Sequence, residues 1–161
     1  YRSDEAAQKF AAEALGYDRV QLQTIPQRDE AGQPVVNPIS GWEDSFFYDI
    51  DLALSIIRHP EGNTPGLIAY CPEAFTQESQ ATLAELTGEG KAIESILVSL
   101  QDAEEAFACN LVSTGATVIM GDGAPAFKAS LEAHGLTVLT PHIQELSKGG
   151  GYIRCTTLTL D

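Results

Sequence analysis

The sequence has 161 residues, of which 43% are hydrophobic and 20% are charged. This mixture is typical of a globular chain, so it argues against intrinsic disorder and suits one domain over residues 1–161. Nine basic and 23 acidic residues give a formal net charge of −14, which argues against nucleic acid or an anionic membrane surface as a partner.

The hydrophobic pattern predicts a chain that mixes helices and strands. In chain order, the expected elements are a helix at 3–15, a strand at 19–25, an irregular loop at 26–45, strands at 46–57 and 66–70, a helix at 76–86, a strand at 92–98, a helix at 102–109, strands at 111–113 and 117–120, a helix at 125–134, a strand at 136–139, a helical turn at 143–147 and a strand at 152–160. Loops as long as the one at 26–45 are often functional, and Trp42 within it either closes over a site or anchors the loop.

Two predicted helices carry clear end signals. Ser3 is a candidate N-cap for the first helix, and Gly16 follows it as a stop signal. Thr76 is a candidate N-cap for the helix at 76–86.

An internal similarity links two stretches of the chain. The segment GLIAYCPEAF (66–75) resembles ATVIMGDGAPAF (116–127), and each reads as a strand and a turn followed by a helix. Their separation of about 50 residues is typical of propellers and repeat arrays. Such units cannot bury both faces alone, so we expect each to pack against a neighbour.

The cysteines limit the chemistry. Cys71, Cys109 and Cys155 are too few for a disulfide framework, so a reducing compartment such as the cytoplasm is expected. No CxxC pair or histidine-rich cluster suggests a metal, and no cofactor is expected. No apolar run reaches the roughly 18 residues that a membrane-spanning helix needs. Because the chain opens with Tyr1 rather than Met, we expect it to have been processed or cut from a longer polypeptide.

The C-terminal stretch KGGGYIRCTTLTL (148–160) holds a candidate nucleophile. Its glycine run, which includes Gly150 and Gly151, lets the backbone approach a ligand closely, and Cys155 lies near the start of the expected strand. A cysteine so placed is a nucleophile if a neighbour stabilises its thiolate. The alternative is a small buried residue in a core strand, since free cysteine is among the most buried residue types.

Three segments resemble a known enzyme family. PEAFTQESQATLAEL (72–86), FACNLVSTGATVIM (107–120) and LSKGGGYIRCTTLTL (146–160) are similar to the C-terminal half of the guanidino-group-modifying, or pentein, superfamily. Its members include arginine deiminases, dimethylarginine dimethylaminohydrolases, arginine dihydrolases and amidinotransferases. The resemblance implies an α/β fold, a five-bladed propeller of ββαβ-like units, of which this chain would supply roughly the last half. It also implies a small cationic guanidino substrate, with arginine or N-methylated arginine converted to citrulline and ammonia or an amine.

The resemblance assigns roles to individual residues. Cys155 occupies the place of the family's nucleophile, which attacks the guanidinium carbon to form a covalent thiouronium. Asp51, in FYDIDLAL (47–54), matches the acid that holds the guanidinium. Arg2 matches an arginine that clamps the substrate α-carboxylate, a task that suits a bidentate guanidinium fork, although a solvated residue at a helix start is the alternative. Asn110 matches a family asparagine and is expected to be structural.

Asp49 departs from the family pattern, which has a histidine at this place as general acid and base. An aspartate is ordinarily ionised at neutral pH and lacks the proton that a leaving amine needs. His59, His134 and His142 are not obvious replacements. Asp49 is therefore either an engineered inactivating change or a natural variant with altered or lost activity.

Two classes of function stay open. The first is a hydrolase of linear amidines that uses Cys155, Asp51 and Arg2, with an amidinotransferase as the neighbouring enzyme class. The second is a non-catalytic pentein that binds a guanidino ligand or a partner protein. Because family enzymes take further acids from an N-terminal half, we also expect a second polypeptide, either that missing half or a symmetry mate.

Overall fold

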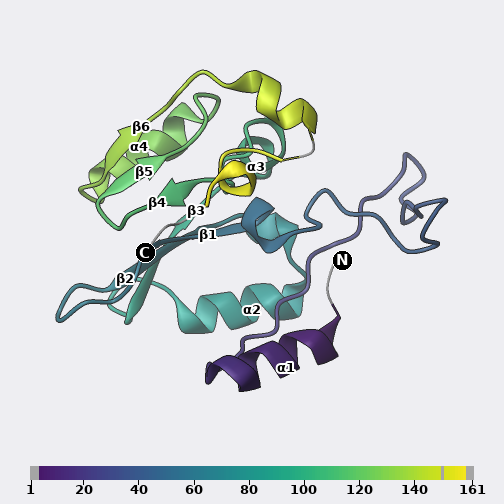
Figure 1. Ribbon diagram of the computed structural model, residues 1–161, viewed down its shortest axis with the longest axis horizontal. Helices are drawn as coiled ribbons and strands as arrows, with labels where there is room; N and C mark the ends of the chain where they lie inside the picture. Colours follow the sequence, from purple (N-terminus) through teal and green to yellow (C-terminus); the bar gives the residue numbers. More distant parts are fainter. Residues whose placement is uncertain (1–3, 150, 159–161) are drawn as a thin grey trace.

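The computed structural model describes residues 4–149 and 151–158 and contains two three-stranded sheets (Figure 1). In the first sheet, β1 (Leu54–Arg58) pairs antiparallel with β2 (Gly66–Tyr70). β2 in turn pairs in parallel with β3 (Ile93–Leu97). The parallel pairing requires a crossover connection between β2 and β3.

The second sheet repeats this arrangement. β4 (Val112–Ser113) pairs antiparallel with β5 (Thr117–Ile119), and β5 pairs in parallel with β6 (Thr137–Leu139). The crossover helix is α2 (Gln77–Leu86) in the first unit and α4 (Pro125–Ala133) in the second. The described chain thus contains two ββαβ units in succession, which confirms that the two similar sequence segments share one structure.

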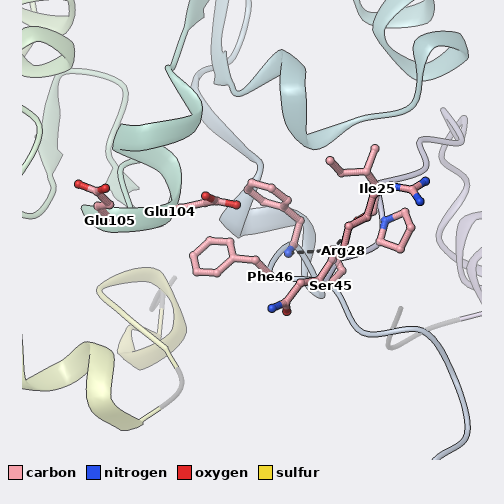
Figure 2. A pocket seen from close by; sticks show the side chains of 9 residues that line it. Ile25, Arg28, Ser45, Phe46, Glu104 and Glu105 are labelled. Atoms are coloured by element: carbon pink, nitrogen blue, oxygen red, sulfur yellow. Dashed lines mark hydrogen bonds between the residues drawn. The ribbon is translucent and has the colours of Figure 1, made fainter. Parts of the chain in front are cut away.

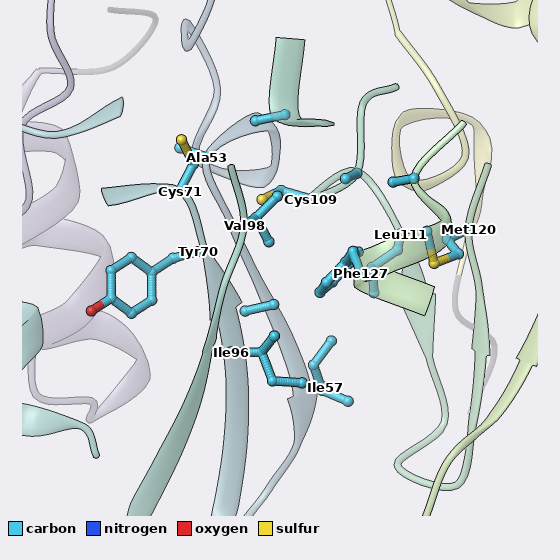
Figure 3. Packing of buried hydrophobic residues seen from close by; sticks show 14 of the residues in the cluster. Ala53, Ile57, Tyr70, Cys71, Ile96, Val98, Cys109, Leu111, Met120 and Phe127 are labelled. Atoms are coloured by element: carbon cyan, nitrogen blue, oxygen red, sulfur yellow. The ribbon is translucent and has the colours of Figure 1, made fainter. Parts of the chain in front are cut away.

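One hydrophobic core extends through both units. Leu67 of β2 and Val118 of β5, which occupy similar places in their units, are both fully buried. The Ser113 Oγ of β4 donates a hydrogen bond to the Ile57 carbonyl of β1 at 2.6 Å, which joins the two sheets. Figure 3 shows side chains from the two units facing one another across this core.

The predicted helix ends are largely correct. Asp4 caps α1 (Glu5–Leu15), because its Oδ1 accepts a hydrogen bond from a first-turn N–H at 2.7 Å; Ser3 lies outside the described residues. Gly16 ends α1 in the left-handed conformation (φ 71°), and Thr76 caps α2, as predicted. No helix within the described residues is long and apolar enough to cross a membrane.

The remaining segments lie before, between and after the two units. α3 (Leu100–Glu105) begins two residues earlier than predicted, because the Ser99 hydroxyl accepts a hydrogen bond from a first-turn N–H. A 3-10 helix at Gln144–Gly149 follows β6. The loop at 26–45 is irregular, as predicted, and contains two isolated bridges. Trp42 in this loop is 71% exposed, so it does not anchor the loop.

Two strands predicted in the first third of the chain form only in part. Residues 19–25 make one isolated bridge rather than a strand. The strand predicted at 46–57 is confined to β1, because Ile50–Leu52 form a 3-10 helix. Asp49 and Asp51 therefore precede β1 instead of lying inside a strand.

The strand predicted at 152–160 is wrong over the described residues. Arg154–Thr156 form a 3-10 helix, and Ile153 ahead of it is in the α region (φ −58°, ψ −52°). The hydroxyls of Thr156 and Thr157 donate hydrogen bonds to backbone carbonyls four residues earlier, at 3.0 Å and 2.7 Å. Such local bonds compete with strand pairing, so they override the β propensity of threonine.

Candidate active site

Three side chains from distant parts of the sequence meet at one point. Cys155 Sγ lies 3.5 Å from Asp51 Oδ2. Asn110 Nδ2 donates to the same Asp51 oxygen at 2.9 Å and lies 3.3 Å from Cys155 Sγ. The structure thus brings two of the predicted site residues, Cys155 and Asp51, into direct contact and adds Asn110 between them.

Tight turns place these residues. Asp51 and Cys155 are each the middle residue of a three-residue 3-10 helix. Asn110 lies two positions before β4, after a chain reversal at Phe107, whose φ of 51° is unusual for a residue other than glycine. The Asn110 N–H donates to the Phe107 carbonyl at 2.9 Å, which fixes the reversal.

Asn110 is fully buried, and its amide uses both ends. Its Oδ1 accepts hydrogen bonds from the backbone N–H groups of Arg154 at 3.0 Å and of Cys155 at 3.4 Å. Sequence reasoning expected a structural asparagine and missed the contact with the thiol. The available signal was a single polar residue in the apolar run ACNLV (108–112), because a buried amide needs partners.

One oxygen of the Asp51 carboxylate lacks a hydrogen-bond partner among the described residues, and the thiol beside this carboxylate is exposed. Cys155 is exposed, so the alternative of a buried core cysteine is wrong. Asp51 Oδ1 is buried and has no hydrogen-bond partner among the described residues. A buried carboxylate oxygen without a donor is costly, so a cationic N–H donor that reaches it would be bound strongly.

The other predicted site residues have mixed outcomes. Gly151 lies against Cys155, since a Cβ there would come within 2.8 Å of Cys155 Cβ and 3.3 Å of its Sγ. The absence of a side chain at Gly151 therefore makes room for the Cys155 side chain. Contact of Gly151 with a ligand stays a prediction. Asp49 is half-buried directly before the 3-10 helix that holds Asp51. Arg2 and Gly150 lie outside the described residues.

The other two cysteines differ sharply from Cys155. Cys71 and Cys109 are fully buried, and all three thiols are free. Burial raises the pKa of Cys71 to about 11. Burial also raises the pKa of Cys109 well above its ordinary value. At neutral pH both remain protonated and sequestered, so an electrophile in solution meets Cys155 first.

Two of the histidines hydrogen-bond to groups other than Cys155. His142 Nδ1 lies 2.7 Å from Asp122 Oδ2, and this hydrogen bond holds the pKa of Asp122 below its usual value. His134 Nδ1 lies 2.7 Å from the Ser130 carbonyl of its own helix. No group of three or more potential metal ligands occurs within the described residues.

A cleft of about 480 Å³ lies beside Phe46 (Figure 2), and Cys155, Asp51 and Asn110 are not among the residues that line it. Glu104 and Glu105 of α3 line it on one side and Arg28 on the other, as Figure 2 shows. The ring of Phe46 lies 5.4 Å from that of Phe107. Sequence reasoning did not find this cleft, because its walls come from segments that are far apart in the chain.

Comparisons with known proteins agree with this fold. No protein-family model matches the sequence. The chain is 31% identical over 160 residues to N(G),N(G)-dimethylarginine dimethylaminohydrolase of Mycobacterium tuberculosis, a match that covers 99% of this chain and 43% of that protein. It is 33% identical over 115 residues to the bifunctional arginine dihydrolase/ornithine cyclodeaminase AgrE of Nostoc sp., covering 71% of this chain and 15% of that protein.

Solved structures have the same fold. The N-terminal domain of ArgZ, a cyanobacterial arginine dihydrolase, bound to product, superposes with a TM-score of 0.72 at 24% identity and covers 98% of this chain and 48% of its own. A variant of that domain covalently bonded to a reaction intermediate gives a TM-score of 0.71 at 23% identity, covering 96% of this chain and 47% of its own.

The fold and the site define an α/β protein of ββαβ units with a cysteine–carboxylate site between them. The chain belongs to the guanidino-group-modifying, or pentein, superfamily, as the sequence resemblance indicated. It spans less than half the length of the mycobacterial relative, 43%. The described residues form two open sheets, so the closed five-bladed ring stays a prediction.

Proposed function

We propose that this chain carries the nucleophile of a hydrolase that converts a guanidino compound, either arginine or an N-methylated arginine, to citrulline and ammonia or an amine. The observation that carries the proposal is the contact between the exposed Cys155 thiol and Asp51, whose second oxygen has no partner among the described residues. The named activities of the mycobacterial and cyanobacterial relatives support the same class of substrate.

Asp51 would bind the guanidinium of the substrate. Its Oδ1 is a buried acceptor without a partner among the described residues, and a charge-assisted N–H···O bond to it would place the guanidinium carbon near Cys155 Sγ. The formal net charge of −14 favours the encounter with a cation. Binding and orientation would thus come from one carboxylate next to the nucleophile.

The reaction would proceed in two halves. Cys155 Sγ forms a bond to the guanidinium carbon, the C–N bond to the leaving group breaks, and the leaving nitrogen takes the electron pair and a proton. Water then adds to the thiouronium carbon, the C–S bond breaks, and the ureido product leaves as the thiol regains its proton. The covalent intermediate in the ArgZ variant supports such a path. Asp49 stands where the family has its proton donor, and only its protonated form could give that proton.

The first test is made on natively purified protein. Its intact mass identifies every polypeptide present, since the chain spans only part of its relatives. Citrulline release is then measured with arginine and with dimethylarginine. Replacing Cys155→Ser should abolish release, whereas Cys71→Ala, which changes a buried thiol, should retain it in a protein that melts normally. Unchanged release in Cys155→Ser would overturn the proposal. Transfer to an added primary amine would indicate an amidinotransferase instead.

A second candidate is a non-catalytic pentein that binds a guanidino ligand, and the aspartate at position 49 favours it. This reading predicts that the unaltered protein binds arginine without turnover. Asp49→His should then create citrulline release or raise it at least tenfold, because a histidine exchanges protons near neutral pH. Brisk turnover by the unaltered protein would exclude this candidate.

A further inference from the structure

Asn110 contacts both of the groups to which the proposed reaction assigns roles. Its Nδ2 lies 2.9 Å from Asp51 Oδ2 and 3.3 Å from Cys155 Sγ. Its Oδ1 accepts the backbone N–H of Cys155 at 3.4 Å. One fully buried amide therefore contacts the nucleophile at two points and the carboxylate at a third.

We propose that Asn110 is a positioning residue that fixes the sulfur of Cys155 against Asp51 Oδ2 and leaves Asp51 Oδ1 as the acceptor for the substrate. The part of this proposal that concerns substrate binding by Asp51 rests on the proposed function. The contact of Asn110 with the thiol does not, so the two are tested separately.

The two ends of the amide have different consequences. A role limited to the fold needs only the Oδ1 end, which holds the backbone turn at Arg154 and Cys155. The Nδ2 end donates instead toward the sulfur and the carboxylate. An N–H donor beside a sulfur favours the thiolate over the thiol, because it stabilises negative charge. The Nδ2 end thus acts on the chemistry of the thiol rather than on the turn.

The same contacts determine which oxygen of Asp51 can bind a guanidinium. Its Oδ2 is approached by two donors, the Asn110 amide and the Cys155 thiol. Its Oδ1 has none among the described residues. A guanidinium would therefore engage Asp51 through one oxygen, with the sulfur held at the adjacent oxygen and close to the guanidinium carbon.

The test uses Asn110→Asp and the pH dependence of Cys155 alkylation by iodoacetamide, a neutral probe, read by mass spectrometry of the Cys155 peptide. The aspartate keeps an acceptor for both backbone N–H groups, loses the donor, and adds a negative charge beside the sulfur. We expect the midpoint of the alkylation profile to rise by about one pH unit or more. Asn110→Ser, which is smaller and uncharged, should raise it by less, because it removes the amide without adding a negative charge.

Asn37→Asp is the matched control. Asn37 Oδ1 also accepts two backbone N–H groups, at 2.9 Å and 3.1 Å, and its Nδ2 also contacts a carboxylate, that of Asp44. It lies in the loop at 26–45, so this change should leave the alkylation midpoint where it is.

The outcomes separate the two proposals. A folded Asn110→Asp protein with the wild-type midpoint would overturn the positioning role, even if Cys155→Ser abolishes citrulline release. If Asn110→Asp does not fold, Asn110→Ser decides, and an unshifted midpoint in that variant overturns the role equally. A shifted midpoint without any Cys155-dependent turnover would support the positioning role and reject the hydrolase.

Discussion

The two ββαβ units have the same strand order but place different chemistry ahead of their first strands. The first unit has strands of five residues and carries Asp51, a charged acceptor, three positions before β1. The second has strands of two or three residues and carries Asn110, a neutral amide, two positions before β4. The two side chains meet at 2.9 Å, and Cys155 joins them from the segment that follows the second unit.

This comparison shows how a repeat can build a site. The repeated fold brings the entrance of each unit to the same place, so the position of a side chain is set by architecture. The residue type at that position then sets its role: a carboxylate accepts from a cation, and an amide can donate to one neighbour while it accepts from another. The site is thus assembled from the segments that precede the first strand of each unit, together with Cys155.

The largest expected effect tests whether the two units share one core. Leu67→Ala in the first unit should lower the free energy of unfolding by about 2–5 kcal/mol, and Val118→Ala in the second by about 1–2 kcal/mol, since fewer methyl groups are removed. Urea denaturation followed by circular dichroism measures both, with Ile56→Ala, which is 58% exposed, as the control. Each variant should unfold in one transition, and two separate transitions would show that the units are independent.

The next effect isolates the contribution of the first unit to the site. Asp51→Asn removes the charge that would hold a guanidinium, at a cost of about 1.5–3 kcal/mol, so alkylation of Cys155 by 2-chloroacetamidine should slow roughly tenfold to a hundredfold. Alkylation by neutral iodoacetamide should not slow in parallel. Asp44→Asn is the control, because Asp44 also accepts from an asparagine amide but lies in the loop at 26–45. Equal slowing with both reagents would contradict a cation-binding role for Asp51.

A smaller effect tests the link between the units. Ser113→Ala removes the 2.6 Å hydrogen bond to Ile57 and also the acceptor of the Gly115 N–H at 3.0 Å, so we expect a loss of about 1 kcal/mol in the free energy of unfolding. Ser130→Ala is the matched control, because its hydroxyl bonds to a carbonyl of its own helix at an exposed position. A loss that is no larger in Ser113→Ala than in Ser130→Ala would mean that this bond does not hold the sheets together.

The sequence predicts the two units well because their signals are local. Hydrophobic strands, capping residues such as Thr76 and the left-handed Gly16 act within a few positions, and the structure contains them where they were expected. Two similar segments about 50 residues apart were enough to indicate a repeat. The resemblance to the family carried the pairing of Cys155 with Asp51.

The sequence predicts the turns at the site poorly, because hydrogen bonds made by side chains decide their conformation. Alternating Thr and Ile residues favoured a strand around Cys155, yet threonine hydroxyls that bond to nearby carbonyls hold a 3-10 helix there. The role of Asn110 depends on partners 59 and 45 positions away, which no local pattern encodes. Side-chain hydrogen bonds, short-range for the threonines and long-range for Asn110, were therefore the part that needed the structure.

The smallest effect appears only in alkaline solution and compares the buried thiols of the two units. Cys71 follows β2, Cys109 precedes β4, and burial raises the pKa of both above the ordinary value of 9.0. Between pH 9 and about 11 the unfolded chain loses these protons while folded Cys71 keeps its own, so stability that is complete below pH 9 falls as the pH rises. Melting temperatures measured from pH 7 to 10.5 should decline by a few degrees above pH 9, and Cys71→Ala or Cys109→Ala should each flatten the decline. A flatter curve in only one variant would show that the core excludes water from one unit more completely than from the other.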